Sequence, residues 1–495
     1  MNRSTLSLIG VAVALAAVAG FATVTGAGTP DAAPAVSAAR LPVERSTLAC
    51  PVPSDSDFAS TTYTAFTPKG DSAGGPGAGG TAALLPAAPV NGKAAKRKPV
   101  APLKEAGTPV TAVTEAADAP ALIGTADGAL APGWTVQQTT VVDAGPARAV
   151  LGTSCAVPDS EFWFPGVSTG ADRQDYVHLT NPDDTAAVVD LRLYGDKGEV
   201  KTTTTDGITV PPGATVPVLL STLTTEKSDT LTLHVSARSG RVGATVEAED
   251  AKAGGDWLPA AADPAAEAVM PGIPGDATEV RLVVYATGDS DADLKLRLAS
   301  SSGEITPAGH ETVHVKSGMT TAVDLGDVTK GETGSLLLSP TEPARKAPVV
   351  AALRITRGKG ANRETAFLPA TAPVGDRATA ADNRTKGSTI ALTAPEADAA
   401  VRVVTSASTK GGEPVTKNVP VKRGTTVVLS PPAPSEGKGA FAVTVEAASG
   451  GPVYASRMLA LPEDGVPMFT IQTMPDDRGL VAVPRTEEDL SILNR

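Results

Sequence analysis

The chain has 495 residues, enough for three or four domains, and a net charge of −12, which argues against a nucleic-acid partner because phosphate binding needs a basic surface. Hydrophobic residues make up 41% of the sequence but aromatic residues only 3%, so we expect cores built from Val, Leu, Ala and Thr on strands rather than a large aromatic ligand pocket. The 49 glycines and 42 prolines fit many short strands joined by turns.

Residues 1–30 are predicted to be a signal peptide or a membrane anchor. Arg3 precedes an uncharged stretch whose apolar part is Leu8–Val24. This part is close to the roughly 18 residues that can span a bilayer, so a cleaved leader and an uncleaved anchor through residues 7–25 both remain open. The positive charge at the start predicts that the rest of the chain lies on the extracellular side of the cytoplasmic membrane, anchored or secreted.

The two cysteines of the sequence, Cys50 and Cys155, lie in similar surroundings, C-P-V-P-S and C-A-V-P-D-S. A redox or metal-binding thiol pair would favour a C-x-x-C spacing or an adjacent histidine, and the sequence has neither here. Two cysteines on the exported side of a membrane most simply form one disulfide. We therefore predict a structural disulfide between Cys50 and Cys155.

Residues 31–165 are interpreted as a degenerate β unit with a flexible insertion rich in Gly, Pro and Lys at 68–106. The insertion holds Gly70–Gly74, which matches G-x-S-x-G. It continues into further glycine instead of a helix, which favours a linker over a nucleophile elbow. The basic run Lys96–Lys98 is either a solvated part of this linker or a contact for anionic wall polymer or lipid head groups.

Three units of matching pattern follow, with expected bounds 166–265, 266–375 and 376–474, and a charged tail at 475–495 closes the chain. Each unit has six or seven short alternating segments with turn residues about every ten positions. Each also has a strand that ends in a turn on glycine: Ile208–Gly213, Val313–Gly318 and Val419–Gly424. The pattern predicts an all-β protein of tandem immunoglobulin-like or fibronectin-like sandwiches.

The most specific catalytic motif is H-E-x-x-H at His310, Glu311 and His314. Zinc peptidases place this spacing on a helix, so that both imidazoles face one ion. Here Pro307 and Gly309 precede the motif and the following residues alternate as in a strand, on which residues four apart lie about 13 Å from each other. A zinc-dependent hydrolase is therefore the less favoured alternative, and we expect no cofactor.

The acidic turns of the three units allow a calcium alternative, although acidic residues favour hairpin turns without any metal. The sequence around Asp289 lacks the glycine and glutamate of an EF-hand loop. The residues concerned are Asp183, Asp184, Asp289, Asp291, Asp293, Glu396 and Asp398.

Phe162, Trp163 and Phe164 form the densest aromatic run in the chain and follow Cys155 closely. Two interpretations stay open: a hydrophobic contact between two domains, or a platform on which a sugar or a protein stacks.

The stretch from Cys155 to Gly198 contains C-A-V-P, F-W-F-P-G and L-T-N-P-D-D-T-A-A-V-V-D-L-R-L-Y-G-D-K-G. It resembles an actinobacterial family of exported proteins that is known only as a domain of unknown function. The resemblance implies a location in the cell envelope and no particular activity. We therefore expect a non-catalytic envelope protein that displays tandem sandwiches to another exported protein or to wall polysaccharide. A polysaccharide-binding module centred on Trp163 is the main alternative.

Overall fold

The structure, a computed structural model, describes residues 39–70, 79–88, 98–144, 148–203 and 207–483. The predicted leader at 1–30, most of the Gly70–Gly74 motif, Lys96, Arg97 and the end of the tail lie outside these residues. Within them, no helix is long and apolar enough to cross a membrane. Residues 42–479 form one compact unit. The flanking strands β1 (Ala39–Pro42) and β36 (Leu480–Val483) pair in a small sheet of their own.

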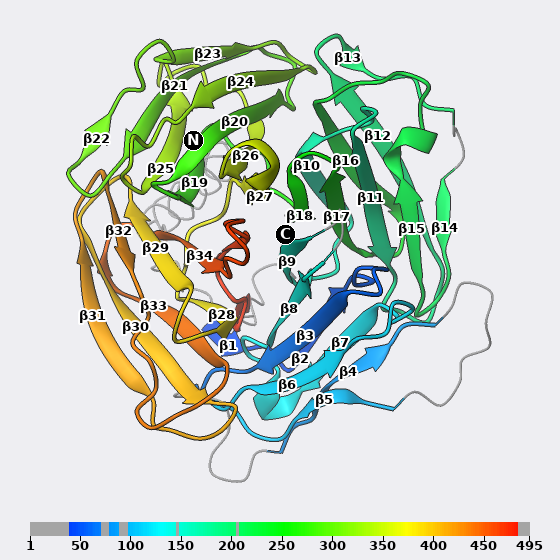
Figure 1. Cartoon of the computed structure of the whole chain (residues 1–495), viewed down its shortest axis with the longest axis vertical. Coiled ribbons are helices and arrows are strands. Elements are labelled where there is room, and N and C mark those ends of the chain that lie inside the picture. The colour runs from blue at the N-terminus through cyan, green and yellow to red at the C-terminus, as the bar shows by residue number, and fades with distance from the viewer. Residues whose placement is uncertain (1–38, 71–78, 89–97, 145–147, 204–206, 484–495) are drawn as a thin grey trace, which may run out of the picture. The chain divides into compact units, whose positions relative to one another are not determined.

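Four antiparallel β-sandwiches, here called modules 1 to 4, follow one another within the compact unit (Figure 1). Module 1 contains β2 (Arg45–Cys50), β3 (Ala59–Phe66), β4 (Ala82–Pro86), β5 (Val100–Leu103), β6 (Val110–Thr114), β7 (Leu122–Asp127), η1 (Gly128–Leu130), β8 (Thr135–Val142) and β9 (Ala149–Ser154). Module 2 contains β10 (Glu161–Val167), β11 (Arg173–Thr180), β12 (Ala187–Gly195), β13 (Gly198–Glu199), β14 (Ile208–Val210), β15 (Thr215–Leu219), η2 (Leu220–Thr222), β16 (Leu231–Ser239), β17 (Gly243–Asp250) and β18 (Gly254–Leu258).

Module 3 contains β19 (Ala268–Ile273), β20 (Ala277–Ala286), β21 (Ala292–Ala299), β22 (Glu304–Ile305), β23 (Thr312–Val315), β24 (Thr320–Gly326), β25 (Gly334–Pro340), β26 (Val349–Arg357), η3 (Gly360–Asn362) and β27 (Glu364–Pro369). Module 4 contains β28 (Arg377–Asn383), β29 (Ser388–Ala394), β30 (Ala399–Ser408), β31 (Val415–Val421), β32 (Thr425–Leu429), β33 (Phe441–Gly450), β34 (Tyr454–Ala460) and β35 (Phe469–Thr473). The prediction of tandem β-sandwiches is confirmed.

The four modules share one strand order, which the sheets of module 1, β2-β7-β4-β5 and β6-β3-β8-β9, illustrate. The corresponding sheets are β10-β16-β12-β13 and β15-β11-β17-β18 in module 2, β19-β25-β21-β22 and β24-β20-β26-β27 in module 3, and β28-β33-β30-β31 and β32-β29-β34-β35 in module 4. Modules 2 and 3 add a short strand, β14 or β23, on β12 or β21. Module 1 is therefore a complete copy of the repeat.

The segment 68–106, expected to be a flexible insertion, contains strands β4 and β5. Their side chains Leu84 and Leu103 are buried in the core of module 1, and β4 pairs with β7. The Gly- and Pro-rich composition hid two strands of only five and four residues, because such short strands depend on their neighbours in the sheet rather than on local propensity.

The first strand of module 2 lies earlier than the sequence indicated. Strand β10 covers the aromatic run and pairs with β16, so the expected boundary at residue 165 falls inside a strand of module 2. Near its end, β10 also has a bulge between Pro165 and Val167. This irregularity and the run of bulky residues on both faces conceal the alternation on which the boundary was based.

The glycine turns recur with one backbone geometry. Gly213, Gly318 and Gly424 have φ angles of 62°, 68° and 68°, a left-handed conformation that favours glycine. The acidic turns support them in modules 3 and 4: Asp291 accepts a hydrogen bond from Ser317 N at 2.9 Å and Asp398 accepts one from Arg423 N at 2.7 Å. The acidic residues at these two positions therefore stabilise the neighbouring turn.

The last strands of the four modules, β9, β18, β27 and β35, are here called the closing strands. They contact one another in cyclic order, β9 with β18, β18 with β27, β27 with β35 and β35 with β9. Three of them place an aromatic side chain in the preceding module. Trp257 packs in the core of module 1, Phe367 in that of module 2 and Phe469 in that of module 3. Each of these cores is completed by the next module.

The contact between module 4 and module 1 is more polar. Thr139 donates a hydrogen bond to Asp382 at 2.8 Å, and Asp382 N donates one to Gln137 at 2.7 Å. Smaller apolar contacts, such as Phe66 with Ala381 and Ala442, accompany them. Modules that are neighbours in the chain are thus joined mainly by aromatic packing, and the first and last modules largely by buried hydrogen bonds.

Candidate functional site

The junctions that follow the four closing strands meet around one cavity, here called the junction cavity. Because the closing strands contact one another, the segments that leave them are brought together. The cavity has a volume of about 310 Å³. It is lined by parts of Cys155–Glu161, Pro259–Asp263, Ala370–Ala372 and Thr473–Arg478 together with residues of the adjoining strands. All four modules, or the segments that follow them, contribute residues to its lining, and we take it as the candidate site.

Carboxylates and hydroxyls dominate the polar part of the lining. The ionisable lining residues are Asp159, Glu161, Asp263, Asp476, Asp477 and Arg478, and the hydroxyls belong to Thr135, Ser154, Thr245, Thr371, Thr379 and Thr473. These groups can hydrogen-bond to the hydroxyls of a sugar or to the amides of a peptide. With five carboxylates and one guanidinium on the lining, a neutral or cationic ligand group is favoured over an anionic one.

One of the carboxylates is already neutralised. Burial raises the pKa of Asp477, and the adjacent Arg377, whose Nε donates to it at 2.5 Å, opposes this shift. A Cβ on Gly133 of module 1 would lie 2.5 Å from Arg377 Nη2, and Gly133 has a φ of 74°, so a side chain here would displace the guanidinium and strain the backbone. The ion pair therefore belongs to the contact between modules 1 and 4.

The aromatic run contributes mainly to packing. Phe162 and Phe164 lie in the core of module 2. The Trp163 ring stacks on His234 at 3.8 Å and on Tyr285 of module 3 at 5.4 Å, and its Nε1 donates to Glu161 at 3.1 Å. Trp163 is 8% exposed, so it reaches the cavity with little of its ring. This geometry matches the hydrophobic contact between two domains and leaves little aromatic surface for a stacked sugar.

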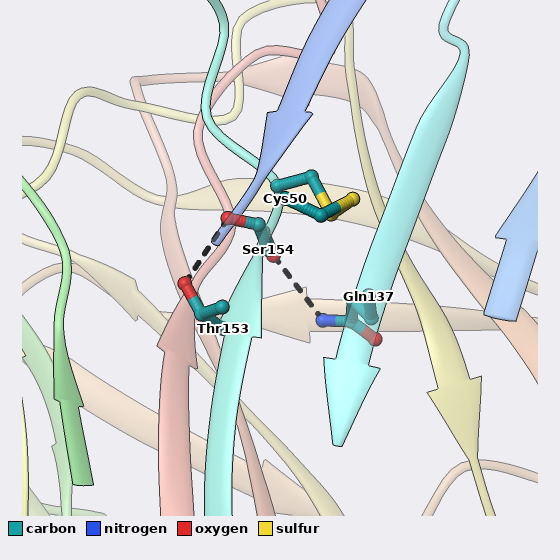
Figure 2. The surroundings of a disulfide bond; sticks show 5 residues. Cys50, Gln137, Thr153 and Ser154 are labelled. Carbon is teal, nitrogen blue, oxygen red and sulfur yellow. Dashed lines mark hydrogen bonds between the residues drawn. A yellow bond between two sulfur atoms is a disulfide. The ribbon is translucent and has the colours of Figure 1, made fainter. Parts of the chain in front are cut away.

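The disulfide is present between Cys50 at the end of β2 and Cys155 directly after β9. Figure 2 shows Cys50 beside the end of β9, where Gln137 donates a hydrogen bond to Ser154 at 3.4 Å. Both cysteines are buried, and Cys155 lines the junction cavity. The disulfide thus fixes one wall of the cavity to the core of module 1, as well as closing that module.

The H-E-x-x-H residues do not share a helix. His310 and Glu311 lie in a turn and His314 on strand β23, opposite Asp293 of β21. His314 is half exposed, with Nδ1 at 2.7 Å from Asp293 and Nε2 at 3.5 Å from Asp291. Among the residues that the structure describes, no group of three or more His, Cys, Asp or Glu side chains is placed to hold a metal.

Replacing His314 with threonine, the residue at the matching register position in module 2, is expected to change the free energy of unfolding by less than about 0.5 kcal/mol, because the side chain is exposed. Thermal unfolding and metal analysis of the purified protein would check this. Stoichiometric zinc that disappears in H314T would instead support the hydrolase alternative.

Comparison with known proteins gives a family. The model of a family of unknown function, DUF5719, matches residues 110–432, about two thirds of the chain. The chain belongs to this family. No curated protein and no solved structure matches it. The DUF5719 match begins at β6 and ends just beyond β32, so it covers modules 2 and 3 completely and parts of modules 1 and 4.

Sequence reasoning identified some lining residues of this DUF5719 member but missed the cavity. Cys155, Phe162 and Trp163 were singled out and all line it. The segments that follow modules 2, 3 and 4 were not. One available signal was the repeated ending aromatic-Leu-Pro, which occurs at Trp257–Pro259 and Phe367–Pro369 and marks both the inserted aromatic and the start of the junction.

Proposed function

We propose that this DUF5719 member is a non-catalytic interaction protein of the cell envelope, exported or anchored in the membrane, and that its junction cavity and the surrounding loops contact a partner. The resemblance described above supports an actinobacterial envelope in particular. The observation that carries the proposal is the buried Cys50–Cys155 disulfide beside the cavity. Disulfides of this kind persist in oxidising compartments outside the cytoplasm.

The packing of the modules supports a display role. The closing strands and the inserted aromatics hold four sandwiches in contact, so the junctions are fixed by the cores rather than by linkers. A binding surface on a preorganised scaffold loses less conformational entropy when it binds. The partner is another envelope protein or wall polysaccharide.

Site-specific crosslinking in living cells tests this function. A photoreactive amino acid replaces Val157, which is exposed and lines the cavity, and in the control it replaces Val113, which is exposed on β6 outside the cavity. We expect one defined protein or glycan adduct at position 157 and none at 113. Equal adducts at both positions, or none at either, would contradict an interaction at the junction cavity.

The hydroxyl-rich lining gives the polysaccharide alternative its own test. Because Trp163 also packs between modules 2 and 3, its removal would disturb folding as well as binding. A better variant is Val157→Lys, with Val113→Lys as the control. Sedimentation with isolated cell wall that is lost only in V157K would support glycan binding, and unchanged sedimentation would dismiss it.

A further inference from the structure

The closing strands meet around a second feature, a cluster of ionisable side chains that are completely buried. Asp256 comes from β18 of module 2, Glu364 from β27 of module 3, and Asp382 and Arg457 from β28 and β34 of module 4. All four have an exposed fraction of 0%. We call them the central charge cluster. Charged groups so far from water are rare and need partners.

Asp256 links the modules directly. Its Oδ1 accepts hydrogen bonds from Gly152 N of β9 and from Trp257 N, both at 2.8 Å. Its Oδ2 has no hydrogen-bond partner among the described residues. One oxygen of this carboxyl group therefore joins modules 1 and 2. The Thr470 side chain and the Ile471 N–H of β35 oppose the rise in the pKa of Asp256, but no described donor forms a hydrogen bond of good geometry with the other oxygen.

Glu364 is the least satisfied member of the cluster. Both carboxylate oxygens are buried without a hydrogen-bond partner among the described residues. A Cβ on Gly254 would lie 2.6 Å from Glu364 Oε1, so the carboxyl group of module 3 rests directly on β18 of module 2. An ionised carboxylate in this position would lack both water and a donor, a state that costs several kcal/mol.

No cation among the described residues forms an ion pair with these two carboxyls, although Arg457 acts electrostatically on Asp256 and Arg148 on Glu364. Arg457 donates to Gln472 at 2.5 Å and has its Nη2 at 3.8 Å from Asp382, which also pairs with Arg384 at 3.4 Å. Arg148, which acts electrostatically on Glu364, lies partly exposed and faces Asp464 at 4.0 Å. The negative charge of an ionised Asp256 therefore disfavours ionisation of Glu364.

The electrostatics agree with this geometry. Burial raises the pKa of Asp256 well above its usual value. Burial first, and the nearby Asp256 second, raise the pKa of Glu364 to about 9. Backbone N–H groups of Gly255 and Thr365 oppose the shift of Glu364 without forming a hydrogen bond of good geometry.

We propose that Asp256 and Glu364 form a proton-operated latch, which holds the modules closed while both carboxyls are protonated and loosens the contact of the closing strands when they ionise. Both groups are ionised at neutral pH in the unfolded chain, so folding takes up protons. Stability is fully present below the unfolded pKa values of about 4 and is lost as the pH rises toward the folded values.

The test measures urea unfolding of the purified protein from pH 6 to 8. Each group that binds a proton on folding raises the unfolding constant by up to about tenfold per pH unit. Glu249, whose pKa burial raises to about 7, adds to the dependence of the wild-type protein over this range, so each variant is compared with the wild-type protein. Glu364→Gln, which keeps the shape of the protonated acid, should lower this dependence by up to about tenfold per unit relative to the wild-type protein. Asp256→Asn should do the same. The control is Glu115→Gln, at an exposed position of module 1, and it should keep the wild-type dependence.

Hydrogen exchange, corrected for intrinsic rates, separates a latch from a general loss of stability. Amides of β9, β18, β27 and β35 should lose protection between pH 6.5 and 8.5, while the inner strands of each module, such as β11 and β20, keep theirs. The proposal is overturned if E364Q retains the wild-type pH dependence, or if the closing strands lose no more protection than the inner strands do.

Discussion

Replacement of Trp257 by alanine is expected to lower the free energy of unfolding by about 3–5 kcal/mol, the usual cost of removing a large aromatic side chain from a core. Trp257 belongs to module 2 but has an exposed fraction of 0% and packs against Ala149 and Leu151 of module 1. The substitution therefore opens a hole in a core that belongs to the preceding module. Denaturant unfolding of the purified protein would measure the loss.

Trp257→Phe is the matched control. Phenylalanine keeps a ring in module 1 and removes the Trp257 Nε1–H group, which is buried and has no hydrogen-bond partner in the part of the chain that the structure describes. We expect it to cost less than W257A, because the cavity that phenylalanine leaves is smaller. Hydrogen exchange in W257A should show lost protection in β9 as well as in β18. Loss confined to module 2 would contradict the described insertion into module 1.

Removal of the disulfide is expected to have a similarly large effect. The crosslink joins residues 105 positions apart, and for a loop of about 100 residues the chain-entropy model gives a stabilisation of about 4.7 kcal/mol. The double variant C50A/C155A should therefore lose about 4–5 kcal/mol in denaturant unfolding, with the first losses of protection in β2 and β9. Cys50 is the last residue of β2, and Cys155 follows β9 directly.

Wild-type protein reduced before unfolding serves as the control for this variant, because it lacks the crosslink but keeps both side chains. Its stability should agree with that of C50A/C155A within about 1 kcal/mol, the contribution of the two small buried groups. A double variant that loses less than about 1 kcal/mol would show that module 1 is held closed by its core alone.

Much of the fold could be predicted from local pattern. Alternating segments and glycine turns such as Gly318 indicated three sandwiches, because strands and turns depend largely on nearby residues. Strands β4 and β5 escaped prediction because their stability comes from pairing with β7 and from the burial of Leu84 and Leu103. These contacts are not visible in a Gly- and Pro-rich stretch.

The candidate site was harder to predict from the sequence than the fold. The junction cavity is formed by segments about a hundred residues apart, and the central charge cluster combines Asp256, Glu364 and Arg457 from three modules. The repeated aromatic-Leu-Pro ending marks where two of the junctions begin, but nothing along the chain indicates that the junctions meet. By contrast, the disulfide followed from the presence of only two cysteines, and the strand pattern around His314 correctly predicted that H-E-x-x-H has no helix.

The inserted aromatics also set an order for assembly. A chain that is synthesised from its N-terminus exposes module 1 first, yet the place of Trp257 in that module stays empty until module 2 has emerged. The same holds for module 2 and Phe367, and for module 3 and Phe469. Each new module therefore finishes the one before it. If synthesis stops after module 1, 2 or 3, the last module of the truncated chain lacks the aromatic side chain that completes its core. The exposed apolar surface of that core is a feature that proteases and chaperones can recognise.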